Sequence, residues 1–172
     1  MRIQLMLRYF RTALDDRCRQ ASLASGLVWA AIAWAVAYSV STVNSSATDA
    51  LRTFAGGMVA APLIGLVMGQ ISRHFSSYST HRRAAVSLVG LYLSAYLFLL
   101  ATGVPHLITA VLAGTDLFAV RPGAAPVAYR LLIQDPLLGS IVGLTLSGYV
   151  LVLWPLSYLN HRLVGAVSGG SS

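Results

Sequence analysis

The feature that most constrains this chain is a series of long runs that contain no charged side chain. These runs occupy about residues 21–43, 54–72, 84–102 and 137–159. About 20 apolar residues in a helix are enough to cross the hydrocarbon core of a bilayer. A helix also satisfies its own backbone hydrogen bonds, which lipid cannot do. The sequence therefore predicts an all-α integral membrane protein, a four-helix transmembrane bundle formed by one domain over residues 21–160.

Composition agrees with lipid as the solvent of these runs. Of 172 residues, 56% are hydrophobic and only 10% are charged, and the mean hydropathy is +0.71, outside the usual balance of a soluble domain. All 12 basic residues are Arg and all 5 acidic residues are Asp. This use of Arg without Lys, together with much Ala and Gly, suggests a GC-rich bacterial genome. We therefore expect a multi-pass protein of the bacterial inner membrane.

The distribution of Arg predicts the orientation of the bundle. Nine of the 12 Arg precede the first run, separate the second run from the third, or follow the fourth run. The other side has only Arg52, Arg121 and Arg130. The positive-inside rule then places both termini in the cytoplasm, as an even number of crossings requires. Because the Arg residues flank apolar runs and do not cluster on a soluble face, we expect no nucleic-acid partner.

The segment over residues 1–20 has the pattern of an amphipathic helix. Apolar residues such as Ile3, Leu7 and Phe10 recur at helical spacing, while Arg8 and Arg11 fall on the opposite face. This pattern predicts an interfacial helix on the inner leaflet, with Arg side chains near anionic phospholipids. The residues expected to contact head groups are Arg8, Arg11, Arg73, Arg82, Arg83 and Arg162.

The third run stays uncharged beyond the length of one straight crossing. Pro105 follows Gly103 and Val104, and a residue before proline is disfavoured in a helix. The sequence thus predicts that the third helix ends near residue 102, with a short interfacial helix over 106–113. The outer loop over 103–136 is rich in Pro and Gly but nearly as apolar as the runs, so we expect it to fold over the bundle or contact a partner. Residues 161–172 are expected to form a flexible cytoplasmic tail.

Small residues recur at every fourth position in the second and fourth runs. Such a stripe lets two helices approach closely in lipid, where packing drives association. Two interpretations stay open, packing within the chain and a face for another copy or another membrane subunit. Pro62 and Pro155 predict bends in the same helices. The stripes consist of Gly57, Ala61, Gly65 and Gly69, and of Gly139, Gly143 and Ser147.

The middle of each run lacks ionisable side chains, which usually mark ion and proton pathways in membranes. No catalytic or zinc-binding motif stands out. His74 and His161 are the histidine pair that could meet at the inner ends of two helices, as a haem would require, but solvated histidines are expected. Asp116 and Asp135 are expected to be ordinary loop or cap residues. We therefore expect no metal, no cofactor and no catalytic residues.

Three functions are compatible with these observations. The first is a non-catalytic subunit or accessory or assembly factor of a larger bacterial membrane complex, which docks through the small-residue helix faces. The alternative is a small oligomeric transporter or flippase of a lipid-linked or apolar substrate. That alternative fits a chain of two related hairpins, because residues 71–75 resemble residues 159–163. The third is a membrane enzyme that uses polar residues of the outer segment.

Overall fold

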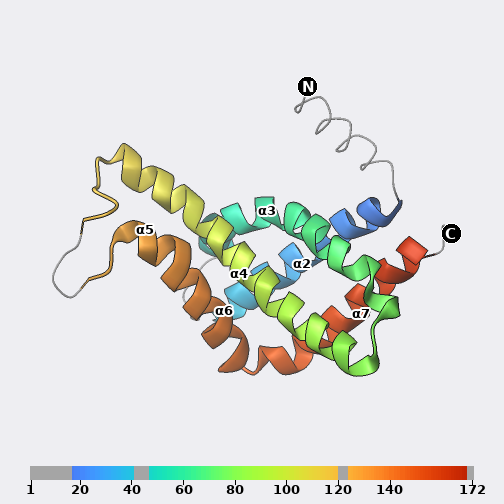
Figure 1. Ribbon diagram of the computed structural model, residues 1–172. Helices are drawn as coiled ribbons and strands as arrows, with labels where there is room; N and C mark the ends of the chain where they lie inside the picture. The colour runs from blue at the N-terminus through green and yellow to red at the C-terminus, as the bar shows by residue number, and fades with distance from the viewer. Residues whose placement is uncertain (1–16, 41–46, 120–123, 170–172) are drawn as a thin grey trace.

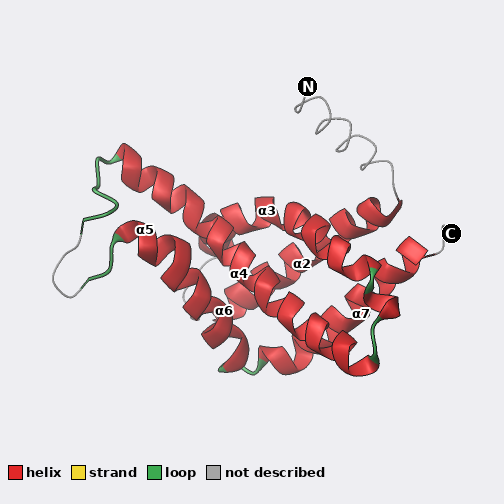
Figure 2. Cartoon of the chain, viewed as in Figure 1, coloured by secondary structure: helices red, strands yellow, loops and turns green. Residues whose placement is uncertain are grey.

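The computed structural model describes residues 17–40, 47–119 and 124–169, which form helices and connecting loops (Figure 2). Residues 1–16 of the predicted interfacial helix, which include Arg8 and Arg11, therefore lie outside the described residues. Three short elements connect the main helices: η1 (Phe75–Ser77), α5 (Val127–Tyr129) and η2 (Arg130–Gln134). The main helices are α2 (Arg17–Val40), α3 (Ala47–Arg73), α4 (Thr80–Leu112), α6 (Asp135–Thr145) and α7 (Tyr149–Gly169).

Among the described residues, three helical segments are long and apolar enough to cross a membrane. They are Leu51–Ser77, Thr80–Leu112 and Val127–Thr145, and most of their residues are not buried within the chain. Large apolar side chains such as Val59, Leu63 and Val89 point outward. Exposed apolar surface of this extent marks an interaction with membrane or protein. The length and composition of these helices are those of a membrane protein.

The two sides of the bundle are distinguished by where the helices begin and end (Figure 1). Ser22, near the start of α2, lies against Gly69, near the end of α3. Gly165, near the end of α7, lies against the backbone carbonyl of Ser72. These three helix ends therefore share one side of the bundle, and the connection between α4 and α5 lies on the other side, at the left of Figure 1.

α4 does not end where the sequence predicts. The helix continues through Gly103 and Pro105 to Leu112, although Pro105 has no N–H to donate to the Ala101 carbonyl. α3 packs over this position at Gly56, where an added Cβ would lie 3.1 Å from Pro105 Cδ. α4 therefore stays helical through Pro105, where it packs against α3, and the predicted break near residue 102 is wrong.

The outer segment is consequently more helical than expected. The predicted interfacial helix over 106–113 is the last part of α4, and the chain is helical again from Val127. The loop between α4 and α5 is therefore much shorter than the predicted 103–136. Gly103 allows α4 and η2 to approach each other, because an added Cβ would lie 2.7 Å from the Leu131 carbonyl oxygen of η2.

The fourth run is not one continuous helix. α6 ends at Thr145 and α7 begins at Tyr149, with Gly148 between them at a φ of +74°. Glycine adopts this left-handed conformation at little steric cost, and it often ends a helix. The predicted single span over 137–159 is wrong in this respect, because the turn at Gly148 divides the run. The predicted flexible tail over 161–172 is also wrong as far as residue 169, because α7 continues to Gly169 and buries His161 and Val164.

A wide helical turn in η2 precedes Pro136. A proline at this position cannot donate to the Leu132 carbonyl and would clash with it in a regular helix. The Leu132 carbonyl instead accepts a hydrogen bond from the Tyr96 hydroxyl at 3.4 Å. Tyr96 therefore links α4 to the antiparallel segment that contains α6.

Candidate functional site

Small residues bring α2 and α3 into backbone contact. A Cβ added to Gly65 would lie 2.8 Å from Gly26 Cα, and one added to Gly69 would lie 2.8 Å from Ser22 Cβ. The positions on α2 rise by four while those on α3 fall by four, which is the register of antiparallel helices. The next pair in this register is Ala30 and Ala61, which belong to one buried cluster with Phe98. We call these three pairs the α2–α3 seam.

The structure places the predicted small-residue stripes in different surroundings. On α3, Ala61, Gly65 and Gly69 belong to the seam, and an added Cβ on Gly57 would lie 2.7 Å from the Phe98 carbonyl oxygen of α4. Packing within the chain therefore occupies this face. The α2 half of the seam was missed in the sequence, although Ser22, Gly26 and Ala30 also recur every fourth residue.

The stripe near α6 is more open. A Cβ on Gly139 would lie 2.9 Å from Leu99 Cδ1 of α4, whereas one on Gly143 would meet nothing within 4 Å. Ser147 is exposed in the turn after α6, and its hydroxyl donates to the Gly143 carbonyl. The described residues thus leave Gly143 and Ser147 without a helix packed against them.

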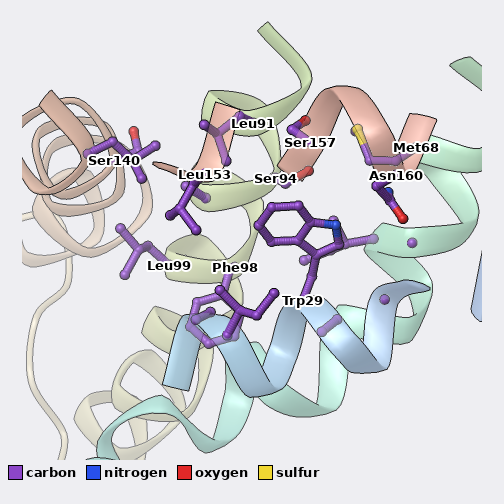
Figure 3. Close-up of a pocket in the computed structure, with 18 of the residues that line it drawn as sticks. Trp29, Met68, Leu91, Ser94, Phe98, Leu99, Ser140, Leu153, Ser157 and Asn160 are labelled. Carbon is purple, nitrogen blue, oxygen red and sulfur yellow. The ribbon is translucent and has the colours of Figure 1, made fainter. Parts of the chain in front are cut away.

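A cavity of about 260 Å³ lies between α2, α3, α4, α6 and α7 (Figure 3). In Figure 3 the Trp29 indole lies between Phe98 and Leu99 on one side and Ser94, Ser157 and Asn160 on the other. Most of the lining is apolar, and none of the lining side chains is Asp, Glu, Lys or Arg. The apolar lining comprises Trp29, Ile32, Ala33, Phe54, Ala61, Ile64, Met68, Leu91, Ala95, Phe98, Leu99, Leu144 and Leu153.

Uncharged polar side chains from α2, α4 and α7 form one end of the cavity. The Ser25 hydroxyl donates to Asn160 Oδ1 at 2.8 Å. This bond leaves the Asn160 amide nitrogen, a double donor, without a hydrogen-bond partner among the described residues. The Ser94 hydroxyl likewise has no partner within the described parts of the chain. We call Ser25, Ser94, Ser157, Asn160 and His161, all of which line the cavity, the polar end.

His161 is held by contacts from three sides. Its Nδ1 lies 2.7 Å from Ser72 Oγ, and because the Ser72 hydroxyl donates to the Met68 carbonyl at 3.0 Å, Nδ1–H is the donor to Ser72. Its ring stacks on Phe75 at a centroid distance of 5.4 Å. Nε2 would lie 2.8 Å from a Cβ on Gly90, so glycine at this position makes room for the ring.

The expectation of solvated histidines is wrong for His161. Its exposed fraction is only 2%, whereas His74 is exposed after the end of α3. The histidine pair considered for haem therefore occupies two different environments. Within the described ranges no group of three His, Cys, Asp or Glu residues could hold a metal ion.

A second set of hydrogen bonds fixes α7 on α4 beside the polar end. The Trp154 indole donates to Ser87 Oγ at 3.0 Å and lies 3.1 Å from the Ala84 carbonyl oxygen. The Ser157 hydroxyl donates to the Ser87 carbonyl at 2.9 Å. Ser87 is fully buried. Ser157 of the polar end therefore already has a partner, and the polar end is placed by packed helices rather than by loops.

The exposed part of the described cavity lining lies on α6. Gly139 and Gly143 line it and are themselves exposed. Their neighbours Leu138, Ile141 and Val142 are large apolar residues that face outward. Among the described residues α2 and α6 make no extensive direct contact, and the cavity separates them. The exposed part of the lining is therefore bordered by apolar side chains, which suits contact with lipid more than with water.

Four of the Arg residues lie outside the cavity and on one side of the bundle. Arg82 lies over the Tyr78 ring at 4.4 Å, and Arg83 donates to the Ser76 carbonyl. Arg73 ends α3, and Arg162 is exposed on α7. All four lie on the side where α2 begins and α3 ends, away from the α4–α5 connection.

The outer segment brings its polar residues together only in part. Arg130 and Asp135 form an exposed ion pair at 3.8 Å, a kind that contributes at most about 1 kcal/mol. Asp116 accepts a hydrogen bond from the Phe118 backbone N–H at 3.0 Å, which is a local loop contact. His106 is exposed on α4. This arrangement does not resemble a catalytic site.

Comparisons with protein families, with curated proteins and with solved structures find no match to this chain.

Proposed function

We propose that this chain is a small multi-pass membrane protein that takes the apolar chain of a lipid or lipid-linked molecule into the cavity and transports it. The observation that carries the proposal is an apolar cavity whose exposed lining residues, Gly139 and Gly143, both lie on α6, and we place the opening of the cavity there. A ligand that enters from the bilayer does not have to cross water. Apolar cavities with a few convergent polar groups are also the usual form of small-molecule sites.

The same proposal includes four crossings, with both ends in the cytoplasm of a bacterial inner membrane. Two observations support it. α2 lies along α3 over the full seam, from Ser22 to Ala30, so it shares the depth of a helix that is apolar enough to span. The gathering of Arg73, Arg82, Arg83 and Arg162 on one side agrees with the positive-inside rule and suits anionic head groups there.

A matched pair of substitutions on α6 tests the cavity. Gly143→Phe places a large side chain at the opening without a clash, because the glycine has open space around it. Val142→Phe places the same side chain at the same depth, at an exposed position that does not line the cavity. The protein is released from its host membrane in mild detergent, and retained lipid is measured by native mass spectrometry.

We expect the wild type and Val142→Phe to retain lipid, and Gly143→Phe to retain at least roughly tenfold less lipid. The three proteins are then reconstituted in vesicles, and translocation of the retained lipid should fall in the same order. Equal retention by the two variants, or no retained lipid on the wild type, would contradict a lipid site at this opening.

A second candidate function is the non-catalytic subunit or accessory factor of a larger membrane complex. Gly143 and Ser147 favour it, since this part of the predicted docking face has no helix against it in the described structure. The test is purification of the untagged protein from its own host in mild detergent. A partner at fixed stoichiometry that Gly143→Phe releases would support docking through α6, and a protein that purifies alone would rule it out.

A further inference from the structure

We propose that the cavity selects a lipid with an uncharged head that carries a hydroxyl or carbonyl group, and that this head lies at the polar end. The inference rests on the proposed function and adds the chemical class of the ligand. It is carried by the kind of polar groups in the lining and by the absence of Asp, Glu, Lys and Arg from its described residues.

The polar end offers both donors and acceptors to a ligand. The Asn160 amide nitrogen is a donor whose oxygen is already bound to Ser25. The Ser94 hydroxyl can donate and accept, and the Trp29 indole N–H lies in the same lining. A carbonyl oxygen would accept from the amide, and a hydroxyl could bond to both the amide and the serine. Ester, alcohol and ketone heads fit this set.

An ionic head does not fit the same end. The described lining has no Arg or Lys for a phosphate and no acidic group for an amine. His161, which also lines the cavity, is only 2% exposed and its Nδ1 is already bonded to Ser72. Arg162, two residues after Asn160, is exposed outside the cavity. A phospholipid head would leave its charge uncompensated here, and burying an unpaired charge costs several kcal/mol. The Arg-rich side of the bundle remains available to anionic lipids of the bilayer.

Because the membrane is the solvent of the lipid tail, the head group determines which lipid the cavity selects. An acyl chain gains little when it moves from lipid tails into an apolar cavity, because both surroundings are equally apolar. Hydrogen bonds at the head then decide which lipid is retained. A buried donor left unpaired costs about 1–3 kcal/mol, which corresponds to roughly five- to 150-fold in affinity. The tail would extend from the polar end past Trp29 toward Phe98 and Leu99 (Figure 3).

Trp29 provides a direct readout of occupancy. It lines the cavity, whereas Trp34 and Trp154 do not. The probes are a monoacylglycerol and a monoalkyl phosphate that carry the same brominated 16-carbon chain, because bromine quenches nearby indole fluorescence. Each probe is titrated at low mole fraction into the full-length protein in nanodiscs. Quenching that is lost in Trp29→Phe reports the cavity.

The expected result is saturable, Trp29-dependent quenching by the monoacylglycerol, with at least tenfold weaker quenching by the phosphate. Equal quenching by the two probes would overturn the inference about the head and leave the proposed lipid cavity standing. Stronger quenching by the phosphate would do the same. No Trp29-dependent quenching by either probe would contradict the proposed function itself.

Two substitutions locate the head. Asn160→Leu removes the amide at similar volume, and Ser94→Ala removes a hydroxyl that has no partner to lose within the described chain. Each should weaken monoacylglycerol binding by about fivefold or more, with little effect on the phosphate. Ser76→Ala is the matched control, since Ser76 is exposed in η1 and does not line the cavity. If Asn160→Leu does not fold, Ser94→Ala decides, and unchanged monoacylglycerol affinity in Ser94→Ala would contradict the placement.

Discussion

Gly26 of α2 and Gly65 of α3 lie backbone against backbone, so that a Cβ on Gly65 would lie 2.8 Å from Gly26 Cα. This approach continues on both sides through the pairs of the α2–α3 seam. In lipid, where apolar side chains gain nothing by leaving one apolar phase for another, such close packing is the main source of helix association. The seam therefore fixes α2 as one wall of the cavity.

Replacing Gly65 with leucine should open the seam. The added side chain meets the Ser22 carbonyl and the Gly26 backbone, neither of which can move alone, and overpacking of this kind costs about 1–3 kcal/mol or more. We expect a lower midpoint of thermal unfolding in detergent. Gly143→Leu is the control, because open space surrounds that glycine. Equal midpoints for the two variants would argue against the seam.

The hydrogen bond between Ser72 and His161 should be measurable as a coupling energy. A double-mutant cycle with Ser72→Ala and His161→Phe removes the bond from each side, and phenylalanine retains a ring to stack on Phe75. The two substitutions should be non-additive by about 1 kcal/mol in free energy of unfolding. Additive losses would show that the two side chains do not bond in the folded protein.

The turn between α6 and α7 requires glycine, and a nearby helical glycine does not. Gly148 has a φ of +74°, so Gly148→Ala should destabilise the protein by about 1 kcal/mol. Gly143 is inside α6 with nothing near its missing Cβ, so Gly143→Ala should stabilise by up to about 1 kcal/mol. Unfolding of the two variants checks the opposite signs. A continuous helix over 137–159 would instead be stabilised by both.

The orientation is tested by labelling single cysteines in intact cells. In a Cys18→Ser background, Ser77→Cys and Ala113→Cys place exposed thiols at opposite sides of the bundle. A membrane-impermeant maleimide added from outside should label residue 113 and reach residue 77 only after the cells are broken. Labelling of residue 77 in intact cells would contradict cytoplasmic termini.

The helical class and the apolar segments follow from the sequence, because the spacing between charges is a property of the linear chain. The two misplaced boundaries have different causes, tertiary packing at Pro105 and a local turn at Gly148. Pro105 suggests a break, but α3 packs on the helix there through Gly56. The turn at Gly148 lies inside an uncharged run, so neither charge nor hydropathy marks it.

The cavity could not be predicted in the same way. Its polar end joins Ser25, Ser94 and Asn160 from three helices, and each is an ordinary polar residue when taken alone. From the sequence His161 is expected to be solvated, because it lies just after the end of the fourth uncharged run. Its burial depends on the room left by Gly90 and on Ser72. The period of four in Ser22, Gly26 and Ala30 was present in the sequence and would have indicated the α2 half of the seam.

The most direct test of a lipid-accepting cavity is photocrosslinking with a fatty alcohol that carries a diazirine on its chain. The protein is irradiated in native membranes, and the labelled residues are mapped by mass spectrometry. A cavity that accepts lipid predicts labels on lining residues such as Trp29, Ala95 and Leu153, which an excess of unlabelled alcohol removes. Labels confined to outward-facing residues such as Val59 and Leu151, with no competition, would contradict it.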